Sequence, residues 1–433
     1  MSNPYSGPRA AEECPKQGAR PFLVPKRFEI SVLCFLGLLI ATCDRVNIAV
    51  AAPSIMREYG WNTTQMGWAF SAFYVGYVLF MIPSGILADR WGPKRTLAGA
   101  VGTWSFFTAL TPLPHALWSL SGLRALMGVG ESATVPSIGA MLARWFPPVE
   151  YSRASGFAWS GGYAGSVLAF PLASLVLRYW GWRAIFYVFA GLGAIWLFFW
   201  WRDASNLPED CPHMDSNERE YIVSLRPRLE VRPKIPWKLI LGAPAAWAVF
   251  LLHFSSNWFT YFLTSWLPTY LQQVRHFSIK NMAVASALPF LCALLGSNVS
   301  GFFIDRLSLT HNRTCISKLF LLSFGGAAVI LALLYRVSSP VAVVVLLCMA
   351  ALLMTGATPV YASGALNLVP RSAGSFVGVQ NTIANMSGVL APVITGYLAA
   401  RYSWTAAFSA TAAVCCIGVF AYLLMGKAER DDY

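Results

Sequence analysis

The sequence predicts an all-α membrane protein whose helices cross the bilayer about twelve times. Of its 433 residues, 56% are hydrophobic and only 12% are charged, and the mean hydropathy is +0.54. Apolar stretches of roughly 20 residues, the length a helix needs to span hydrocarbon, recur from end to end. Because backbone groups in lipid must be satisfied within their own segment, we expect helical spans; the alternating ten-residue segments of a membrane barrel are absent.

The predicted spans follow one another along the chain with one polar interruption. Their centres lie near Leu36, Val75, Gly102, Met127, Gly165, Leu192, Phe254, Leu291, Val329, Leu346, Met386 and Val414. Most Lys and Arg residues then fall in loops on one side, together with both termini. Since basic residues favour cytoplasmic loops, we expect both termini to be cytoplasmic, in a plasma membrane such as the bacterial inner membrane.

The polar interruption divides the spans six and six. Residues 203–240 carry several prolines and most of the charge expected in the cytoplasm. We therefore expect a tail over residues 1–27, a six-helix half over 28–202, the linker over 203–240, a second six-helix half over 241–425 and a tail over 426–433.

Charge, cysteines and motifs exclude several classes of function. The net charge of +13 lies mostly in short loops, where topology and contact with the headgroups of the lipid bilayer explain it without nucleic acid. The nine cysteines lie largely within predicted spans and lack the spacing of metal ligands, so we expect no metal and no cofactor. A GxSxG elbow and a phosphate-binding loop are both absent, so we do not expect an enzyme.

The two halves share a short motif. The pattern Gly-x-x-x-Asp-Arg follows the second span, where it contains Asp89 and Arg90, and recurs after the eighth, where it contains Asp305 and Arg306. Parallel six-helix repeats are the architecture of major facilitator transporters, in which one site at the midplane is exposed to each side in turn as the halves rock.

The first copy of this motif resembles the signature loop of the major facilitator superfamily. Residues 85–95 read Gly-Ile-Leu-Ala-Asp-Arg-Trp-Gly-Pro-Lys-Arg. The resemblance implies a cytoplasmic gate at Asp89 and Arg90, with counterparts at Asp305 and Arg306, in which the carboxylate pairs across the gap between the halves and releases when the protein opens inward. A basic loop that only sets topology is the alternative.

Further stretches resemble the anion:cation symporter family, which includes sialin, the vesicular glutamate transporters and bacterial carriers for galactonate, hexuronates, tartrate and phthalate. The resemblance runs from about residue 28 to 425. The matching stretches are residues 44–47 (Asp-Arg-Val-Asn), 124–136, 145–148 (Trp-Phe-Pro-Pro), 163–165, 253–270 and 373–382.

Four ionisable residues lie inside predicted spans. Asp44 and Arg45 are adjacent in the first span, and Arg124 and Glu131 share one face of the fourth because they are seven residues apart. Asn47 stands one turn beyond Asp44 on the same face. Ionisable groups at this depth cost several kcal/mol each unless they face a wet cavity or the interior of the bundle, so they indicate function.

These residues suit proton-coupled capture of an anion. A carboxylate whose arginine contact changes with conformation can bind and release a proton, and the planar fork of an arginine fits a substrate carboxylate. The family resemblance implies that Asp44 and Glu131 are protonation sites, that Arg45 holds the anion and that Arg124 couples the two. A static interhelical network of salt bridges is the alternative.

Polar residues of other spans are weaker candidates for substrate contacts. They are grouped at helical spacing, and ordinary interhelical hydrogen bonding is the alternative for each. Besides Arg45, Arg124 and Asn47, the candidates are Tyr74, Tyr77, His253, Asn257, Gln380 and Asn381.

The resulting hypothesis is a proton-coupled symporter that takes up a small organic anion, such as a sugar acid or another carboxylate, and that works as a monomer. Sodium-coupled transport of phosphate or organic anions, or anion exchange, is the second reading. A protein that senses an anion without transporting it is a remote third.

Overall fold

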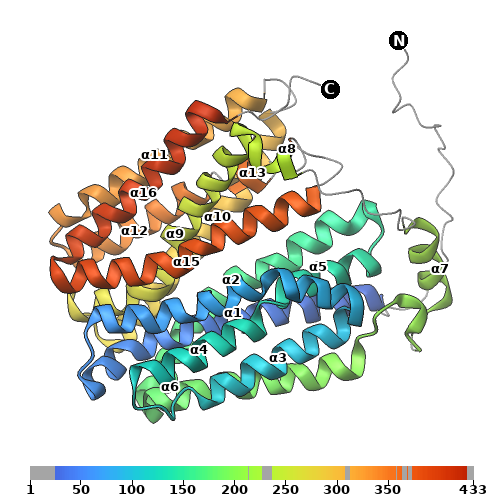
Figure 1. The fold of residues 1–433 in the computed structure, drawn as a ribbon, viewed down its shortest axis with the longest axis horizontal. Helices are drawn as coiled ribbons and strands as arrows, with labels where there is room; N and C mark the ends of the chain where they lie inside the picture. The colour runs from blue at the N-terminus through green and yellow to red at the C-terminus, as the bar shows by residue number, and fades with distance from the viewer. Residues whose placement is uncertain are drawn as a thin grey trace.

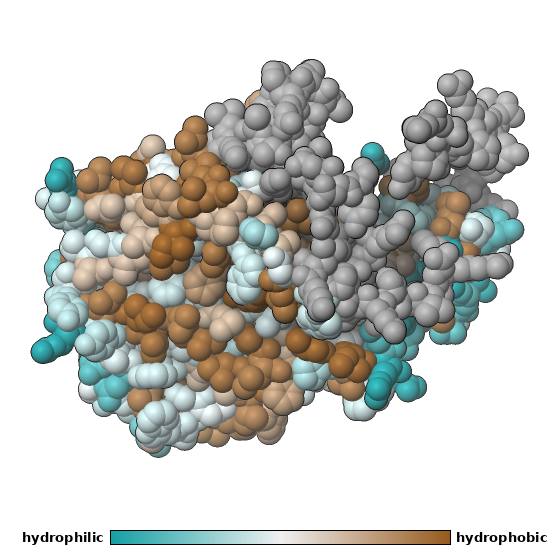
Figure 2. All heavy atoms as spheres, turned by 45° about the horizontal axis from the view of Figure 1, so that its top comes forward, coloured by the Kyte–Doolittle hydropathy of each residue, from teal (hydrophilic) through white to brown (hydrophobic). Residues whose placement is uncertain are grey.

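The computed structural model describes residues 25–212, 214–226, 237–307, 313–356, 358–362, 368 and 373–426. These residues are almost entirely helical and contain no strand, which confirms the predicted all-α class. Figure 1 shows two helical bundles, α1 to α6 in one and α9 to α16 in the other, with α7 beside the first bundle at one end. Figure 2 shows hydrophobic residues over the middle of the visible face and hydrophilic residues towards its ends, as in a protein surrounded by lipid.

The first bundle contains the helices of the N-terminal half. They are α1 (Lys26–Tyr59), α2 (Thr63–Trp91), α3 (Pro93–Leu110), α4 (Leu117–Glu131), α5 (Thr134–Trp145) and α6 (Pro148–Asp203). At 56 residues, α6 would be about 84 Å long if straight, far more than one crossing needs. Gly181, with φ of 80°, breaks it into two spans.

The linker and the second bundle follow. Their helices are η1 (Pro208–Asp210), α7 (Ser216–Leu225), α8 (Trp237–Gly242), α9 (Pro244–Gln273), α10 (Ile279–Leu307), α11 (Arg313–Leu333), η2 (Leu334–Arg336), α12 (Pro340–Thr355), α13 (Thr358–Ala362), α15 (Ala373–Arg401) and α16 (Trp404–Met425). Within the described ranges, α1, α2, α6, α10, α15 and α16 are long and apolar enough to cross a membrane by length and composition alone. Leu321–Arg336 and α12 are shorter apolar segments of the described chain.

The fourth span differs from its prediction. The span centred near Met127 belongs to one apolar run from Leu117 to Leu142, which predicts a single helix. Instead, α4 ends at Glu131 and α5 begins at Thr134. Pro136 explains the break, because it lacks an N–H and its ring clashes with the carbonyl four residues earlier, that of Ser132. Glu131 therefore occupies the last position of a broken helix rather than the middle of a regular one.

Glycines bring α2 and α4 into backbone contact beside this break. A Cβ atom on Gly128 would lie 1.9 Å from the Phe73 carbonyl oxygen, and one on Gly76 would lie 2.0 Å from the carbonyl oxygen of Ala125. Neither distance is possible without moving a helix. The contact fixes where α2 presents its aromatic residues to α4.

We expect Gly128→Ala to destabilise the protein, because the added methyl must separate α2 from α4. Overpacking of this kind costs about 1–3 kcal/mol. Gly122→Ala on the same helix is the matched control, since nothing lies within 4 Å of its Cβ position. The measurement is the midpoint of thermal unfolding of the purified protein; equal midpoints for the two variants would show that the α2–α4 contact is not tight.

The two bundles meet at the end of the molecule where α1 ends and α2 begins, which we call the far face. Thr63 Oγ1 donates to the Gly396 carbonyl oxygen at 2.8 Å. A Cβ on Gly67 would lie 2.8 Å from the Pro392 carbonyl oxygen, so α2 and α15 touch through their backbones there. These contacts, together with the packing of Tyr74 against α15, form what we call the far seam.

At the opposite end, the linker face, where α6 ends and α7 lies, α2 is much less covered. Its buried residues concentrate between Met66 and Tyr77, whereas Ile82 and Ile86 are 61% and 50% exposed. Towards this end, Thr382 Oγ1 of α15 lies 3.9 Å from Met81 Sδ of α2. The bundles are thus packed tightly at the far face and expose α2 at the linker face.

Candidate functional site

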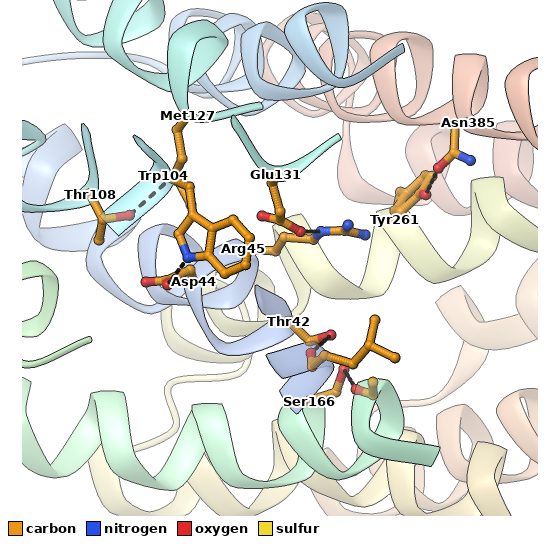
Figure 3. A network of polar contacts seen from close by, with 12 residues as sticks. Thr42, Asp44, Arg45, Trp104, Thr108, Met127, Glu131, Ser166, Tyr261 and Asn385 are labelled. Atoms are coloured by element: carbon orange, nitrogen blue, oxygen red, sulfur yellow. Dashed lines mark hydrogen bonds and ion pairs between the residues drawn. The ribbon is translucent and has the colours of Figure 1, made fainter. Parts of the chain in front are cut away.

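An ion pair between α1 and α4 lies at the centre of the site. Arg45 Nε donates a hydrogen bond to Oε1 of Glu131 (Figure 3). The Arg45 side chain is 19% exposed, whereas that of Glu131 is fully buried. Oε2 of Glu131 has no hydrogen-bond partner within the described residues. Solvent therefore reaches the cation of this pair and not its carboxylate.

Aromatic side chains of α2 lie against the guanidinium groups of both arginines. Arg45 lies 4.8 Å from the ring centre of Tyr77 and 5.6 Å from that of Phe73, and Arg124 lies 5.2 Å from the same Phe73 ring. Arg124 is only 2% exposed, and its Nε has no hydrogen-bond partner in the described part of the chain. It is within electrostatic reach of Glu131. Cation–π contacts at this distance partly compensate for lost hydration.

Asp44 points away from this pair, into the first bundle. Its Oδ1 accepts from Asn47 Nδ2 at 3.3 Å, and its Oδ2 accepts from the indole Nε1 of Trp104 at 3.1 Å. Figure 3 shows Trp104 and Asp44 on one side of α1 and the Arg45–Glu131 pair beside them. Sequence reasoning placed Asn47 correctly but missed Trp104, because no spacing rule relates a residue of α3 to one of α1.

Two tyrosines close the site towards the far face. The rings of Tyr74 on α2 and Tyr261 on α9 lie 4.4 Å apart, and Tyr74 packs on α15 where Gly388 leaves room for its ring. Tyr261 donates to Oδ1 of Asn385 and lies within electrostatic reach of Arg45. The aromatic contact joins the two bundles directly beside the ion pair.

A second polar cluster belongs to the C-terminal half. Gln380 Nε2 lies 3.1 Å from both Nδ1 of His253 and the Tyr361 carbonyl oxygen. The rings of His253 and Tyr361 stack at 4.4 Å with an angle of 13°. Asn257 and Asn381 are half-buried, and Asn381 contributes its backbone oxygen to the hydrogen-bond network. Tyr361 was not predicted, because it lies in a short helix outside every recognisable stripe.

The proposed gating residues lie at the linker face. Asp89 and Arg90 are exposed at the end of α2, and Arg144 on α5 is within electrostatic reach of Asp89. Arg306 is exposed at the end of α10, while the side chain of Asp305 lies outside the described residues. The expected pairing across the halves therefore stays a prediction.

The site contains acids and bases but no evident metal centre. In the parts of the chain that the structure covers, no group of three or more His, Cys, Asp or Glu side chains is arranged to hold a metal ion. The chemistry available is binding of an anion by guanidinium groups and uptake of protons by buried carboxylates.

Known proteins of similar sequence include transporters that are named for anions. The sequence pattern that defines the Major Facilitator Superfamily matches residues 34–392. The chain is 34% identical to the chloroplastic ascorbate transporter of Arabidopsis thaliana over 94% of its own length and 76% of that protein. It is 35% identical to the chloroplastic sodium-dependent phosphate transport protein 1 of the same plant over 94% and 80%, and 29% identical to human sialin over 97% and 93%.

Solved structures share the fold. A bacterial homologue of the human lysosomal transporter Spinster, in an inward-facing and unoccupied conformation, superposes with a TM-score of 0.78 at 17% identity, covering 95% of this chain and 98% of that one. The nucleoside transporter NupG superposes with a TM-score of 0.68 at 14% identity over 93% of this chain and 100% of the other.

Proposed function

We propose that this chain, which belongs to the major facilitator superfamily and is one of its anion transporters, takes up a small organic anion together with protons. It is a multi-pass membrane protein and a transporter rather than an enzyme. The substrate class we propose is a sugar acid or another carboxylate.

The observation that carries the proposal is the pairing of a reachable arginine with a fully buried glutamate. Arg45 offers a guanidinium to solvent, and Glu131 occupies one side of it. A substrate carboxylate must compete with Glu131 for the same donors. Protonation of Glu131 removes that competition, so binding of the anion and binding of the proton favour each other.

Asp44 is the second proposed proton site. It is fully buried and accepts two hydrogen bonds from neutral donors, Asn47 and Trp104, rather than from a cation. Asp44 thus has neutral hydrogen-bond donors and, at longer range, Arg124 to stabilise its charge, whereas Glu131 is directly paired with Arg45. Asp44 lies within electrostatic reach of Glu131, so the charge of one site influences the other.

Two protons suffice to drive uptake of a monovalent anion. Moving one negative charge into a negative-inside compartment costs about 2.3 kcal/mol per 100 mV. One proton cancels that cost, and a second makes uptake electrogenic in the favourable direction. Each proton adds about 1.4 kcal/mol per pH unit of gradient.

The conformation fits one state of an alternating-access cycle. The far seam joins α2 to α15 by backbone contacts, while Ile82 and Ile86 of α2 are exposed towards the linker face. If the linker face is cytoplasmic, as the basic loops predict, this is an inward-facing state. We propose that the protein works as a monomer in a plasma membrane, with both termini in the cytoplasm.

Sodium-coupled transport of phosphate is the second candidate, because one related protein is named a sodium-dependent phosphate transport protein. Phosphate also suits a guanidinium fork. Anion exchange without a coupling cation would need the same arginine but neither carboxylate.

Purified protein in liposomes distinguishes these functions. We expect a proton gradient with the outside more acidic, at zero membrane potential, to drive accumulation of a labelled sugar acid such as gluconate inside the liposomes. We expect a Na⁺ gradient of equal size to drive none. Accumulation of phosphate driven by Na⁺ would favour the second candidate, and uptake that requires a trapped internal anion would favour exchange.

A further inference from the structure

The hydrogen bonds around Gln380 determine which nitrogen of His253 carries the proton. The Tyr361 carbonyl can only accept, so the amide atom 3.1 Å from it must be the donating Nε2. The same Nε2 lies 3.1 Å from His253 Nδ1 and has one hydrogen left to give. Nδ1 therefore accepts, and in the neutral ring the proton resides on Nε2.

This leaves His253 with one fixed donor. The stacked ring of Tyr361 holds the imidazole plane, and the hydrogen bond from Gln380 fixes its rotation. His253 is only half-buried, and Nε2–H is its remaining polar group. Tyr163 of the first bundle is within electrostatic reach of Tyr361, so the cluster lies close to the first bundle.

Four helices of the second bundle carry basic residues only at their ends. In the sequence of α9, α10, α12 and α15, the basic residues are Lys280, Arg306 and Arg401, and all three lie at helix ends. Both intramembrane arginines, Arg45 and Arg124, belong to the N-terminal half. A ligand that spans the two halves can therefore pair a carboxylate with an arginine of the first bundle. A second carboxylate, next to these four helices of the second bundle, would have no cation to pair with.

Resting on the proposed function, we infer that His253 donates from Nε2 to an uncharged acceptor, a hydroxyl or carbonyl oxygen, at the end of the substrate opposite its carboxylate. Gln380 and Tyr361 are positioning residues for that donor. His253 lies eight residues from Tyr261, the residue of α9 near Arg45, which is about 12 Å along the helix. The substrate is accordingly an elongated monoanion with a neutral, hydrogen-bonding tail, and not a dicarboxylate or a small inorganic anion.

Binding of three six-carbon acids to the purified full chain tests the inference. Gluconate is a monoanion with hydroxyl groups, hexanoate is a monoanion without them, and glucarate is a dianion with them. We expect the wild type to bind gluconate most tightly. His253→Phe keeps the ring stacked on Tyr361 but removes the donor, and should weaken gluconate binding roughly 3- to 10-fold while leaving hexanoate unchanged.

Two further variants separate positioning from general damage. Ser255→Ala on the same helix is the control, because Ser255 bonds the Val414 carbonyl on the opposite side, and it should change neither ligand. Gln380→Leu should weaken gluconate binding. It should also let the proton of His253 occupy either ring nitrogen, which would change the ¹⁵N shifts of the His253 ring in labelled protein. An unchanged tautomer in Gln380→Leu would contradict the positioning role.

The outcomes distinguish this inference from the proposed function. If His253→Phe weakens gluconate and hexanoate equally, or if the wild type prefers glucarate, the inference is wrong while carboxylate transport stands. If the wild type binds and accumulates none of the three acids, transport of organic anions fails too. A gluconate-selective loss in His253→Phe supports the assigned donor.

Discussion

Arg45→Ala is expected to abolish carboxylate binding and transport. Of the two intramembrane arginines, Arg45 is the one that solvent reaches, because its side chain is 19% exposed whereas Arg124 is 2% exposed. Loss of a charge-assisted contact in a partly desolvated site costs about 3 kcal/mol, which corresponds to at least about 100-fold in affinity. Arg45→Lys should recover only part of it, because an ammonium cannot bind both oxygens in parallel.

The single variant alone does not separate binding from stability, because it leaves Glu131 buried without its partner. Removing one member of a buried pair is itself destabilising, whereas removing both is often nearly neutral. We therefore expect the double variant Arg45→Ala/Glu131→Gln to regain the thermal stability of the wild type and still fail to bind gluconate. The measurements are the unfolding midpoint and the ligand-induced shift of that midpoint.

Recovery of ligand binding in the double variant would contradict the assignment of Arg45 to the substrate. It would mean that the guanidinium serves only to neutralise Glu131. The same result would support the alternative of a static salt-bridge network, which the sequence left open.

The architecture was predictable because lipid imposes strict rules on a chain. Span length follows from the thickness of hydrocarbon, and the repeated Gly-x-x-x-Asp-Arg pattern revealed the two halves. The break after Glu131 was missed, although Pro136 announces it, because a proline inside an apolar run is compatible with either a kink or a break. By contrast, helix α6 turns sharply at Gly181, where the sequence predicted the end of one span and the start of the next.

The site was predictable within a helix and much less so between helices. Helical periodicity correctly put Asn47 beside Asp44, since that contact depends only on a rise and a rotation. The choice of Glu131 as partner of Arg45, and of Trp104 as partner of Asp44, depends on how three helices rotate against each other. Glycine contacts between α2 and α4 set part of that rotation, and no pattern in a single sequence shows how closely the two helices approach there.

Glu131→Gln is expected to keep anion binding and lose pH-driven accumulation. The amide has nearly the shape of the carboxyl group but does not ionise in the working pH range, so it never competes for Arg45 as a carboxylate does. Wild-type affinity for gluconate should rise as the pH falls, because protonation of Glu131 frees the guanidinium. The variant should lose this part of the pH dependence and keep only what Asp44 contributes. In liposomes with one unit of pH gradient and no potential, the wild type should accumulate the anion about tenfold per coupled proton, and the variant not at all.

Counterflow exchange supplies the control for folding and access, since it requires both conformations but no net proton movement. We expect Glu131→Gln to exchange labelled for unlabelled gluconate at a substantial rate. Glu58→Gln, which removes the exposed ion pair with Arg183 at the far face, should behave as the wild type in every assay.

Asp44→Asn should lose accumulation too, but also some stability, because an amide there can accept from only one of its two donors, Asn47 or Trp104. Undiminished concentrative uptake by Glu131→Gln would leave Asp44 as the sole candidate for proton coupling, and undiminished uptake by both variants would show that proton coupling does not run through these carboxylates.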